Sequence, residues 1–304
     1  MPRFLEAGPG RAASQGGSPA ARLRALLARP GLRVMPCCFD ALSARLVERA
    51  GFELTFMSGF AVSAARLALP DVGLISYGEM LDAGRAICEA VQVPVIGDAD
   101  TGYGNAVNVK RTVHGYARAG FACVMIEDQI APKRCGHTAG KEVVSRAEAL
   151  ARIRAAVDAR EEGADVLILA RTDARAVHGL DEALARARAF RELGADLLFV
   201  EAPADEAELA RVAAELPAPV MANLVEDGVT PLLPPARLEA LGFKIAAYPL
   251  TLLSAAARAM EDALAALAAG GVPGPERRLA FDALCERVGF PDYDAARRRY
   301  AAEE

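Results

Sequence analysis

The feature that most constrains the fold is a repeated unit, in which a short apolar run is followed by a longer amphipathic stretch. From Leu32 onward the apolar runs lie at Leu32–Cys38, Leu54–Met57, Pro94–Asp98, Ala122–Glu127, Asp165–Ala170, Leu197–Val200, Pro219–Ala222 and Lys244–Tyr248. Continuous apolar runs, as opposed to alternating ones, are typical of parallel strands that are covered on both faces. The repeat therefore predicts an α/β protein.

The stretches between these runs have the pattern of helices, as in Ala147–Arg160 and Asp181–Leu193. Glycine commonly separates a helix from the next strand, in RAGFELTF, RAGFACVM, EEGADVLI and ELGADLLF, as expected of the residue that ends many helices. Eight such units in 304 residues, with no sequence left for a second domain, predict a (β/α)8 TIM barrel. A doubly wound open sheet is the alternative, but it would have to be unusually wide.

The ends of the chain differ in character from its middle. We expect residues 1–20 to form a flexible arm, because they are rich in Gly, Pro, Ser and Ala and lack the apolar segment of a secretory signal. The barrel is expected over residues 21–269. Residues 270–304 follow a Gly- and Pro-rich break and contain helical pieces at Glu276–Val288 and Tyr293–Ala302. These pieces are too short to form a domain alone, so we expect them to pack on the barrel or on a neighbouring subunit.

Composition excludes several classes of protein. The net charge is −5 and no basic tract is present, which argues against a nucleic-acid partner. No stretch approaches the roughly 20 uninterrupted apolar residues of a membrane span, so we expect no membrane partner. Six cysteines without CxxC spacing are too few for a disulfide scaffold and favour a reduced, cytoplasmic setting.

Polar residues follow the predicted strands in six consecutive units. They are Ser58, Asp98 with Asp100, Glu127 with Asp128, Arg171 with Thr172, Glu201, and Asn223. In a closed parallel barrel these strand ends surround one mouth, which is where barrel enzymes carry their active sites. One such residue is easily explained as the start of a loop, but polar residues at the ends of six consecutive strands indicate an enzyme.

The run DADTGYG, residues 98–104, predicts a metal site. On an extended strand end, the carboxylates of Asp98 and Asp100 would point the same way, and Glu127 at the next strand would complete the acidic cluster. Oxygen-only ligands favour Mg²⁺, with Mn²⁺ as a substitute, and the absence of histidine argues against Zn²⁺. The alternative is a turn in which the aspartates cap a helix.

The run PKRCGH, residues 132–137, predicts a reactive thiol on the loop after the fourth strand. Lys133, Arg134 and His137 would place Cys135 in an electropositive setting that shifts it toward the thiolate. Gly136 would give the loop the flexibility of a lid. Cys37, Cys88, Cys123 and Cys285 are expected to be small buried apolar residues.

With both motifs in place, the chain resembles the isocitrate lyase/phosphoenolpyruvate mutase superfamily, in particular its 2-methylisocitrate lyase, 2,3-dimethylmalate lyase and petal death protein-like branch. The resemblance covers roughly Pro36 to Leu267. It rests on SGFAVSAARLALPD, GDADTGYGN, IEDQ, PKRCGH, ARTDA, FVEAP and ANLVEDGVTP, in the order usual for the family. It implies a (β/α)8 barrel whose last helix is exchanged between the subunits of a dimer, with dimers pairing into tetramers.

The resemblance also implies roles for individual residues. Ser58, Gly59 and Phe60 would hold a substrate carboxylate, Arg171 would clamp another, and Glu201 and Asn223 would line the far side of the pocket. Asp98 would bind Mg²⁺ directly, with Asp100 and Glu127 reaching it through water. Asp71, Lys133, Cys135 and His137 would be catalytic. Cysteine in the KRCGH motif marks the carbon–carbon lyases of the superfamily, in which it protonates the carbanion-like product.

The implied reaction is Mg²⁺-dependent cleavage of a 2-hydroxy dicarboxylate, such as a 2-alkylmalate, dimethylmalate or methylisocitrate, to a 2-oxo acid and a carboxylic acid. Val225 stands where isocitrate and methylisocitrate lyases place hydroxyl residues that hold a third carboxylate, which puts tricarboxylates in doubt. The alternatives are an oxaloacetate hydrolase or decarboxylase, or a phosphonomutase-type enzyme of the same superfamily. A non-catalytic protein that binds small acids is a further alternative.

Overall fold

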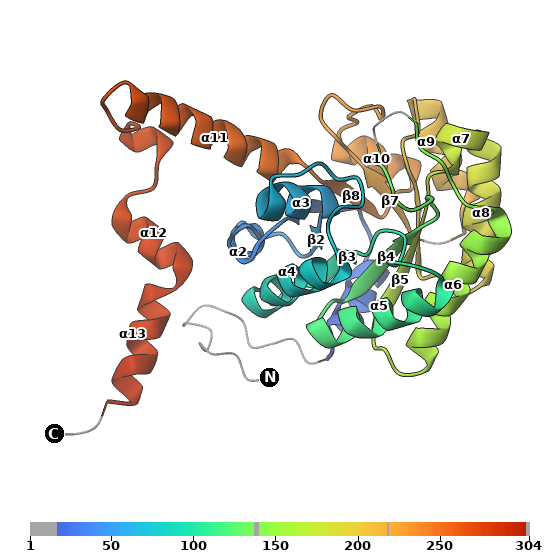
Figure 1. The fold of residues 1–304 in the computed structure, drawn as a ribbon, viewed down its shortest axis with the longest axis horizontal. Helices are drawn as coiled ribbons and strands as arrows, with labels where there is room; N and C mark the ends of the chain where they lie inside the picture. The colour runs from blue at the N-terminus through green and yellow to red at the C-terminus, as the bar shows by residue number, and fades with distance from the viewer. Residues whose placement is uncertain (1–16, 137–139, 218, 302–304) are drawn as a thin grey trace. The chain divides into compact units, whose positions relative to one another are not determined.

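The computed structural model describes residues 17–136, 140–217 and 219–301. Its centre is a closed barrel of parallel strands that pair in sequence order, with β8 closing on β1 (Figure 1). The strands are β1 (Arg33–Cys38), β2 (Thr55–Met57), β3 (Val95–Asp98), β4 (Cys123–Glu127), β5 (Leu167–Thr172), β6 (Leu197–Val200), β7 (Val220–Asn223) and β8 (Ile245–Tyr248). Each lies within two residues of its predicted bounds. The predicted TIM-barrel fold is confirmed.

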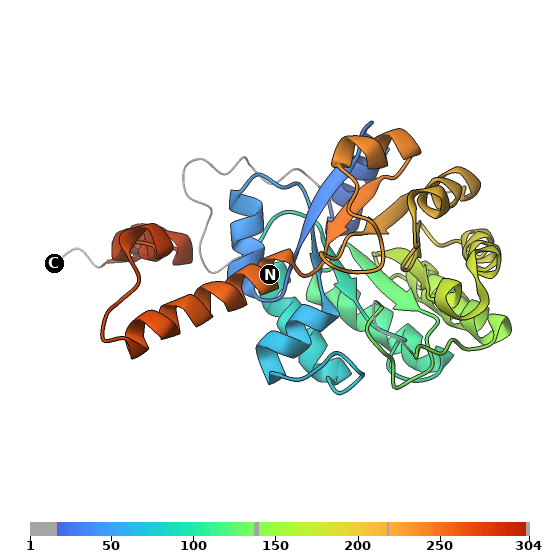
Figure 2. The ribbon, with the colours of Figure 1, turned by 90° about the horizontal axis from the view of Figure 1, so that it is seen from above.

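Helices α2 to α10 connect the strands and lie outside them, as the two perpendicular views show (Figures 1 and 2). They are α2 (Ala41–Arg49), α3 (Gly59–Leu67), α4 (Tyr77–Ala90), α5 (Ala106–Ala119), α6 (Arg146–Glu161), α7 (Ala174–His178), α8 (Leu180–Glu192), α9 (Glu206–Glu215) and α10 (Pro235–Leu241). Helix α1 (Pro19–Ala28) precedes β1, and α11 (Thr251–Ala268) follows β8. A 3-10 turn (Pro275–Arg277), α12 (Phe281–Val288) and α13 (Phe290–Arg299) follow. The two helices used as examples above correspond to α6 and α8.

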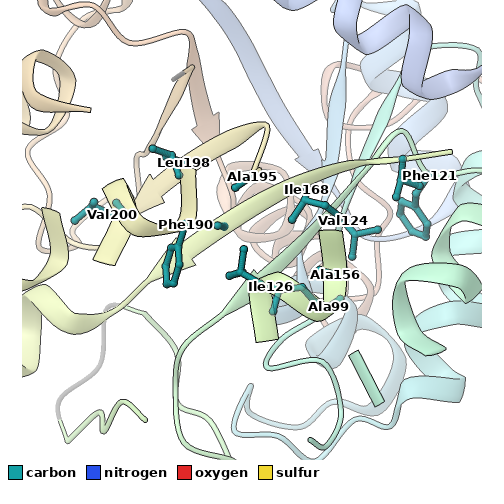
Figure 3. Packing of buried hydrophobic residues seen from close by; sticks show 14 of the residues in the cluster. Ala99, Phe121, Val124, Ile126, Ala156, Ile168, Phe190, Ala195, Leu198 and Val200 are labelled. Atoms are coloured by element: carbon teal, nitrogen blue, oxygen red, sulfur yellow. The ribbon is translucent and has the colours of Figure 1, made fainter. Parts of the chain in front are cut away.

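The strands are apolar throughout because both of their faces are buried. On β4, Val124 and Ile126 face outward and pack in the layer between barrel and helices, with Ile168 of β5 and Ala156 of α6 (Figure 3). Met125, between them in sequence, faces inward and belongs to a separate cluster of buried apolar residues, which fills the barrel interior. Successive side chains of any strand point to opposite faces. Because both faces are buried here, both sets of positions are apolar, and the sequence shows no alternation of polar and apolar residues.

Helix α1 is part of this interior cluster, in which its Ala20, Leu23 and Leu26 are buried together with residues of the strands. Ser18 caps the helix, and its hydroxyl oxygen accepts a hydrogen bond from the Ala21 N–H. The helix therefore begins inside the predicted arm, whose residues 1–16 lie outside the described part of the chain. It was not among the predicted helices.

The chain divides into two compact units, one of residues 17–253 that contains the barrel and a second that contains residues 254–301. The boundary expected from the sequence lies at residue 269, after the eighth helix. None of the residues of α11 is buried. Among the described residues, no helix has the length and apolar character needed to cross a membrane.

Candidate active site

The side chains expected at the mouth of the barrel lie together at the carboxyl ends of consecutive strands. Asp98 ends β3, Glu127 ends β4, Arg171 is the next-to-last residue of β5, Glu201 follows β6 and Asn223 ends β7. The four charged groups among them are buried, although charged residues are rarely buried unless they are paired. Their burial requires the compensating contacts described next.

Asp98 and Asp100 are held by backbone groups beside the start of α3. The Asp98 carboxylate accepts hydrogen bonds from the Gly59 N–H at 3.1 Å and from the Asp100 N–H at 3.0 Å. A Cβ on Gly59 would lie 2.6 Å from Asp98 Oδ2 and 3.5 Å from Asp100 Oδ1, so both carboxylates border the same small space. The expected extended geometry is wrong, because Asp100 has a φ of 48° and lies in a turn. The turn nevertheless brings the two carboxylates together.

Lys133 lies between two buried carboxylates. Its Nζ is 2.7 Å from Asp71 Oδ1 and 2.7 Å from Asp100 Oδ1. Burial raises the pKa of Asp100 to about 6, and the Lys133 ammonium limits the rise. Burial lowers the pKa of Lys133, but the surrounding carboxylates more than offset this and hold that pKa well above its usual range. The charge of Lys133 is thus paired with Asp71 and Asp100, which weakens the electropositive setting expected at Cys135.

Arg171 is surrounded by three carboxylates. Its Nε lies 2.8 Å from Asp173 Oδ2 and 3.2 Å from Glu127 Oε2, and Nη2 lies 3.1 Å from Glu201 Oε2. The guanidinium also stacks 5.2 Å above the centre of the Phe199 ring. Burial raises the pKa of Glu127 well above its usual range, and Arg171 opposes this shift. These contacts fix the plane of the guanidinium, which a bidentate contact to a substrate carboxylate requires.

The loop that carries Cys135 passes directly over this arginine. Cys135 itself is half-buried and Gly136 is buried. A Cβ on Gly136 would lie 2.4 Å from Glu201 Oε2 and 2.7 Å from Arg171 Nη2. The loop after β4 therefore reaches the ends of β5 and β6. His137, the remaining member of the predicted catalytic group, lies outside the described residues.

The other predicted residues border the same mouth. Ser58 is the N-cap of α3, where its hydroxyl oxygen accepts a hydrogen bond from the Ala61 N–H at 3.3 Å. Phe60 follows in the first turn and is half-buried. The Asn223 side-chain amide lies 3.4 Å from both carboxylate oxygens of Glu201. The structure thus brings the described members of the predicted set to one end of the barrel.

Sequence reasoning missed three buried polar residues of the site, namely Gln129, Lys141 and Asp173. Gln129 and Asp173 lie inside the quoted motifs IEDQ and ARTDA, so their position just past strands β4 and β5 was an available signal. Lys141 offered none, because an isolated lysine in a loop usually lies at the surface. It is only 9% exposed.

The donor set fits a divalent cation held largely through water. Asp98 is 6% exposed, and no lysine or arginine of the described residues forms an ion pair with it. Within the described ranges, no group of three or more His, Cys, Asp or Glu side chains is arranged to enclose a metal ion directly. One direct carboxylate with others acting through water is an arrangement that Mg²⁺ accepts, since it keeps several of its waters.

Comparison with known proteins places this geometry in context. The family described as phosphoenolpyruvate phosphomutase matches residues 23–268. The 2,3-dimethylmalate lyase of Eubacterium barkeri is 48% identical over 248 residues, which cover 82% of this chain and 86% of that protein. A solved structure of oxaloacetate acetylhydrolase with the inhibitor 3,3-difluorooxalacetate has a TM-score of 0.90 at 37% identity, covering 94% of this chain and 98% of that one. Phosphonopyruvate hydrolase, solved with oxalate and Mg²⁺, has a TM-score of 0.83 at 31% identity, covering 93% and 99%.

Proposed function

The chain belongs to the phosphoenolpyruvate phosphomutase family, and from that premise we propose that it is a Mg²⁺-dependent carbon–carbon lyase. Its substrate is a 2-hydroxy dicarboxylate of the 2-alkylmalate, dimethylmalate or methylisocitrate type, which it cleaves to a 2-oxo acid and a carboxylic acid. The observation that carries the proposal is the position of the Cys135 loop, whose Gly136 lies against Arg171 and Glu201. A thiol next to a carboxylate clamp is placed to protonate a product held by that clamp.

Binding is assigned to the two sides of the mouth. Asp98 would hold Mg²⁺ directly, with Asp100 and Glu127 acting through water, and Mn²⁺ is the expected substitute. When bound, the ion supplies Lewis-acid stabilisation that lowers the pKa of the substrate hydroxyl. Arg171 binds a carboxylate, and the start of α3 at Ser58, Gly59 and Phe60 faces another with the partial positive charge of a helix N-terminus. Glu201 and Asn223 close the far side.

Proton transfer is assigned to Cys135. The substrate hydroxyl gives its proton to a carboxylate or water at the mouth, and cleavage of the carbon–carbon bond leaves a 2-oxo acid and a carbanion-like carboxylate. The Cys135 Sγ–H donates its proton to that carbon, and the resulting thiolate is reprotonated from solvent before the next turnover. This role needs the thiol and not the thiolate. Two carboxylates, Asp71 and Asp100, pair with the ammonium of Lys133, so that charge is not available to stabilise a thiolate at Cys135. His137 completes the proposed catalytic group.

We also propose a homo-oligomer, a dimer or tetramer in which α11 is exchanged between subunits. Met260, Leu264 and Leu267 on α11 are exposed at spacings of four and three residues, which places them on one face of the helix. Exposed apolar side chains gathered in this way usually mark a protein contact. A second copy of the chain would cover them.

A product assay tests the lyase proposal. We expect release of a 2-oxo acid from at least one of 2,3-dimethylmalate, methylisocitrate and isocitrate, loss of that activity with EDTA, and its return with Mg²⁺ or Mn²⁺. Asp98→Ala should lose the activity at any Mg²⁺ concentration. Asp82→Ala is the matched control, because Asp82 is an exposed residue of α4 that pairs with Arg66. Full activity in excess chelator would exclude the metal-dependent reaction.

Hydrolysis of oxaloacetate is the second candidate. It is favoured by the close similarity to the solved oxaloacetate acetylhydrolase and by Val225, an apolar residue that suits a small dicarboxylate. The same panel should therefore include oxaloacetate, with oxalate and acetate measured as products. Oxalate release without cleavage of any 2-hydroxy acid would establish this activity in place of the lyase.

A further inference from the structure

Two buried polar side chains contact the backbone on either side of Cys135. The first is Gln129, which is 1% exposed. Its side-chain oxygen accepts a hydrogen bond from the Arg134 N–H at 3.0 Å, and its Nε2 donates to the Arg134 carbonyl at 2.9 Å. The pair of bonds engages both polar backbone groups of the residue before Cys135. This pair of hydrogen bonds needs an acceptor and a donor on the same side-chain amide, and no other side chain of similar size provides both in this geometry.

The second is Lys141, which contacts the residue after Cys135. Its Nζ donates to the Gly136 carbonyl at 2.6 Å and lies 2.9 Å from Asp173 Oδ1. The ammonium and the carboxylate are both buried. A buried ion pair contributes little net stability, because desolvation of the two charges offsets their attraction. Its benefit here is the fixed position that it imposes on Gly136.

Both contacts lead to the same guanidinium. Gln129 Nε2 also donates to Glu127 Oε1 at 3.1 Å, and the other oxygen of Glu127 contacts Arg171. Lys141 contacts Asp173, which accepts two hydrogen bonds from Arg171 at 2.8 and 3.2 Å. The backbone on each side of Cys135 is thus connected to Arg171 through one carboxylate.

We propose that Gln129 and Lys141 are positioning residues that hold Cys135 at a fixed distance from the substrate carboxylate bound by Arg171. The inference rests on the proposed function for the role of Cys135 as proton donor. Neither side chain touches the reacting atoms. Each acts through a separate contact, Gln129 through the backbone of Arg134 and Lys141 through the carbonyl of Gly136.

The test compares Gln129→Met and Lys141→Met with the unmodified full-length protein. Each variant keeps an unbranched side chain of similar length and removes the contact with the backbone beside Cys135. We expect kcat to fall by about 10- to 100-fold, since a misplacement of about 1 Å can cost about 10²-fold, while KM changes little because Arg171 keeps its carboxylates. Lys141→Arg retains the charge and the N–H donors and should recover part of the loss.

A second readout needs no substrate. Alkylation of Cys135 by iodoacetamide, followed by mass spectrometry of its peptide, should be several-fold faster in both methionine variants. Lys110→Met is the matched control, because Lys110 pairs with Glu162 at the surface of the barrel. The half-buried Cys88 is an internal reference for general loosening of the fold.

The outcomes separate the two proposals. Faster alkylation of Cys135 alone supports the positioning role, even if no 2-hydroxy acid is cleaved and the lyase assignment fails. The positioning role would be overturned if the alkylation rate of Cys135 were unchanged in both methionine variants. It would also be overturned if Cys88 in the same variants, or Cys135 in Lys110→Met, were alkylated faster to the same extent. Because the variants remove the contacts separately, failure of one to fold leaves the other as the test.

Discussion

Two residues at the mouth of the barrel are glycines because their neighbours leave no room for a side chain. The Cβ positions of Gly59 and Gly136 lie 2.6 Å from Asp98 Oδ2 and 2.4 Å from Glu201 Oε2. Both distances are far below van der Waals contact. The requirement is one of close approach, since neither glycine has a positive φ. At both positions even a methyl group would displace a carboxylate of the site.

Gly59→Ala is predicted to displace the Asp98 carboxylate and to raise the Mg²⁺ concentration needed for half-maximal activity by about tenfold or more, as for changes next to metal ligands in general. Mg²⁺ titration of the activity measures this. Gly78→Ala is the control, because the nearest neighbour of the added Cβ would be 3.9 Å away. Equal Mg²⁺ dependence in the two variants would contradict the assignment of Asp98.

Cys135→Ser is predicted to lower kcat by at least about 10²-fold, because the hydroxyl is a much weaker acid than the thiol and general acids contribute this much. KM should change little, since the thiol does not bind a charge. Steady-state kinetics with the preferred substrate decides it. Cys285→Ser, in the second unit, is the control. Near-normal turnover of Cys135→Ser would favour the hydrolase over the lyase.

Val225 is predicted to select against a third carboxylate. A carboxylate that loses a hydrogen bond in a desolvated site costs about 1–3 kcal/mol, or about one to two decades of affinity. A 2-alkylmalate should therefore have a higher kcat/KM than isocitrate or methylisocitrate, and Val225→Thr should narrow the gap. Preference of the unmodified enzyme for either tricarboxylate would show that other groups anchor the third carboxylate.

At the scale of elements, α1 is a structural part of the barrel and not an appendage. Leu23 is fully buried in the cluster that fills the barrel interior. Leu23→Ala is predicted to lower the free energy of unfolding by about 2–5 kcal/mol, as expected for removal of a core leucine, with kcat and KM nearly unchanged.

Urea denaturation of Leu23→Ala, of Arg24→Ala and of the unmodified protein measures these changes in the free energy of unfolding. Arg24 lies on the same helix, is exposed and forms a long ion pair with Asp165, so its removal should cost about 0–1 kcal/mol. If Leu23→Ala were as stable as Arg24→Ala, α1 would not contribute to the core.

At the scale of the whole molecule, we predict that a second copy of the chain covers the exposed apolar face of α11. Leu264→Arg places a charge in the middle of that face, and we predict a shift toward the monomer in light scattering coupled to size-exclusion chromatography. Arg258→Ala, a change at another exposed position of α11, should leave the oligomer intact. A monomeric unmodified protein at micromolar concentration would exclude the proposed oligomer.

The sequence by itself determined the barrel and the end of the barrel that carries the chemistry. Eight apolar runs separated by helical patterns are local features, and a parallel barrel is the architecture that buries both faces of so many strands. The polar residues Asp98, Glu127, Arg171 and Glu201 lie at or directly after the carboxyl ends of strands, so their convergence could be predicted from the fold class. Cys135 was found in the same way, from its motif in the next loop.

Only the tertiary structure decided how these side chains share their charges. Lys133 pairs with Asp71 and Asp100, which lie far from it in sequence, and so its charge does not serve the neighbouring thiol as local reasoning suggested. An isolated lysine in a loop usually lies at the surface, but Lys141 is buried against Gly136 and Asp173. Pairing between buried charges depends on which distant segments meet and on how completely water is excluded there. Neither property is encoded in the spacing of residues along the chain.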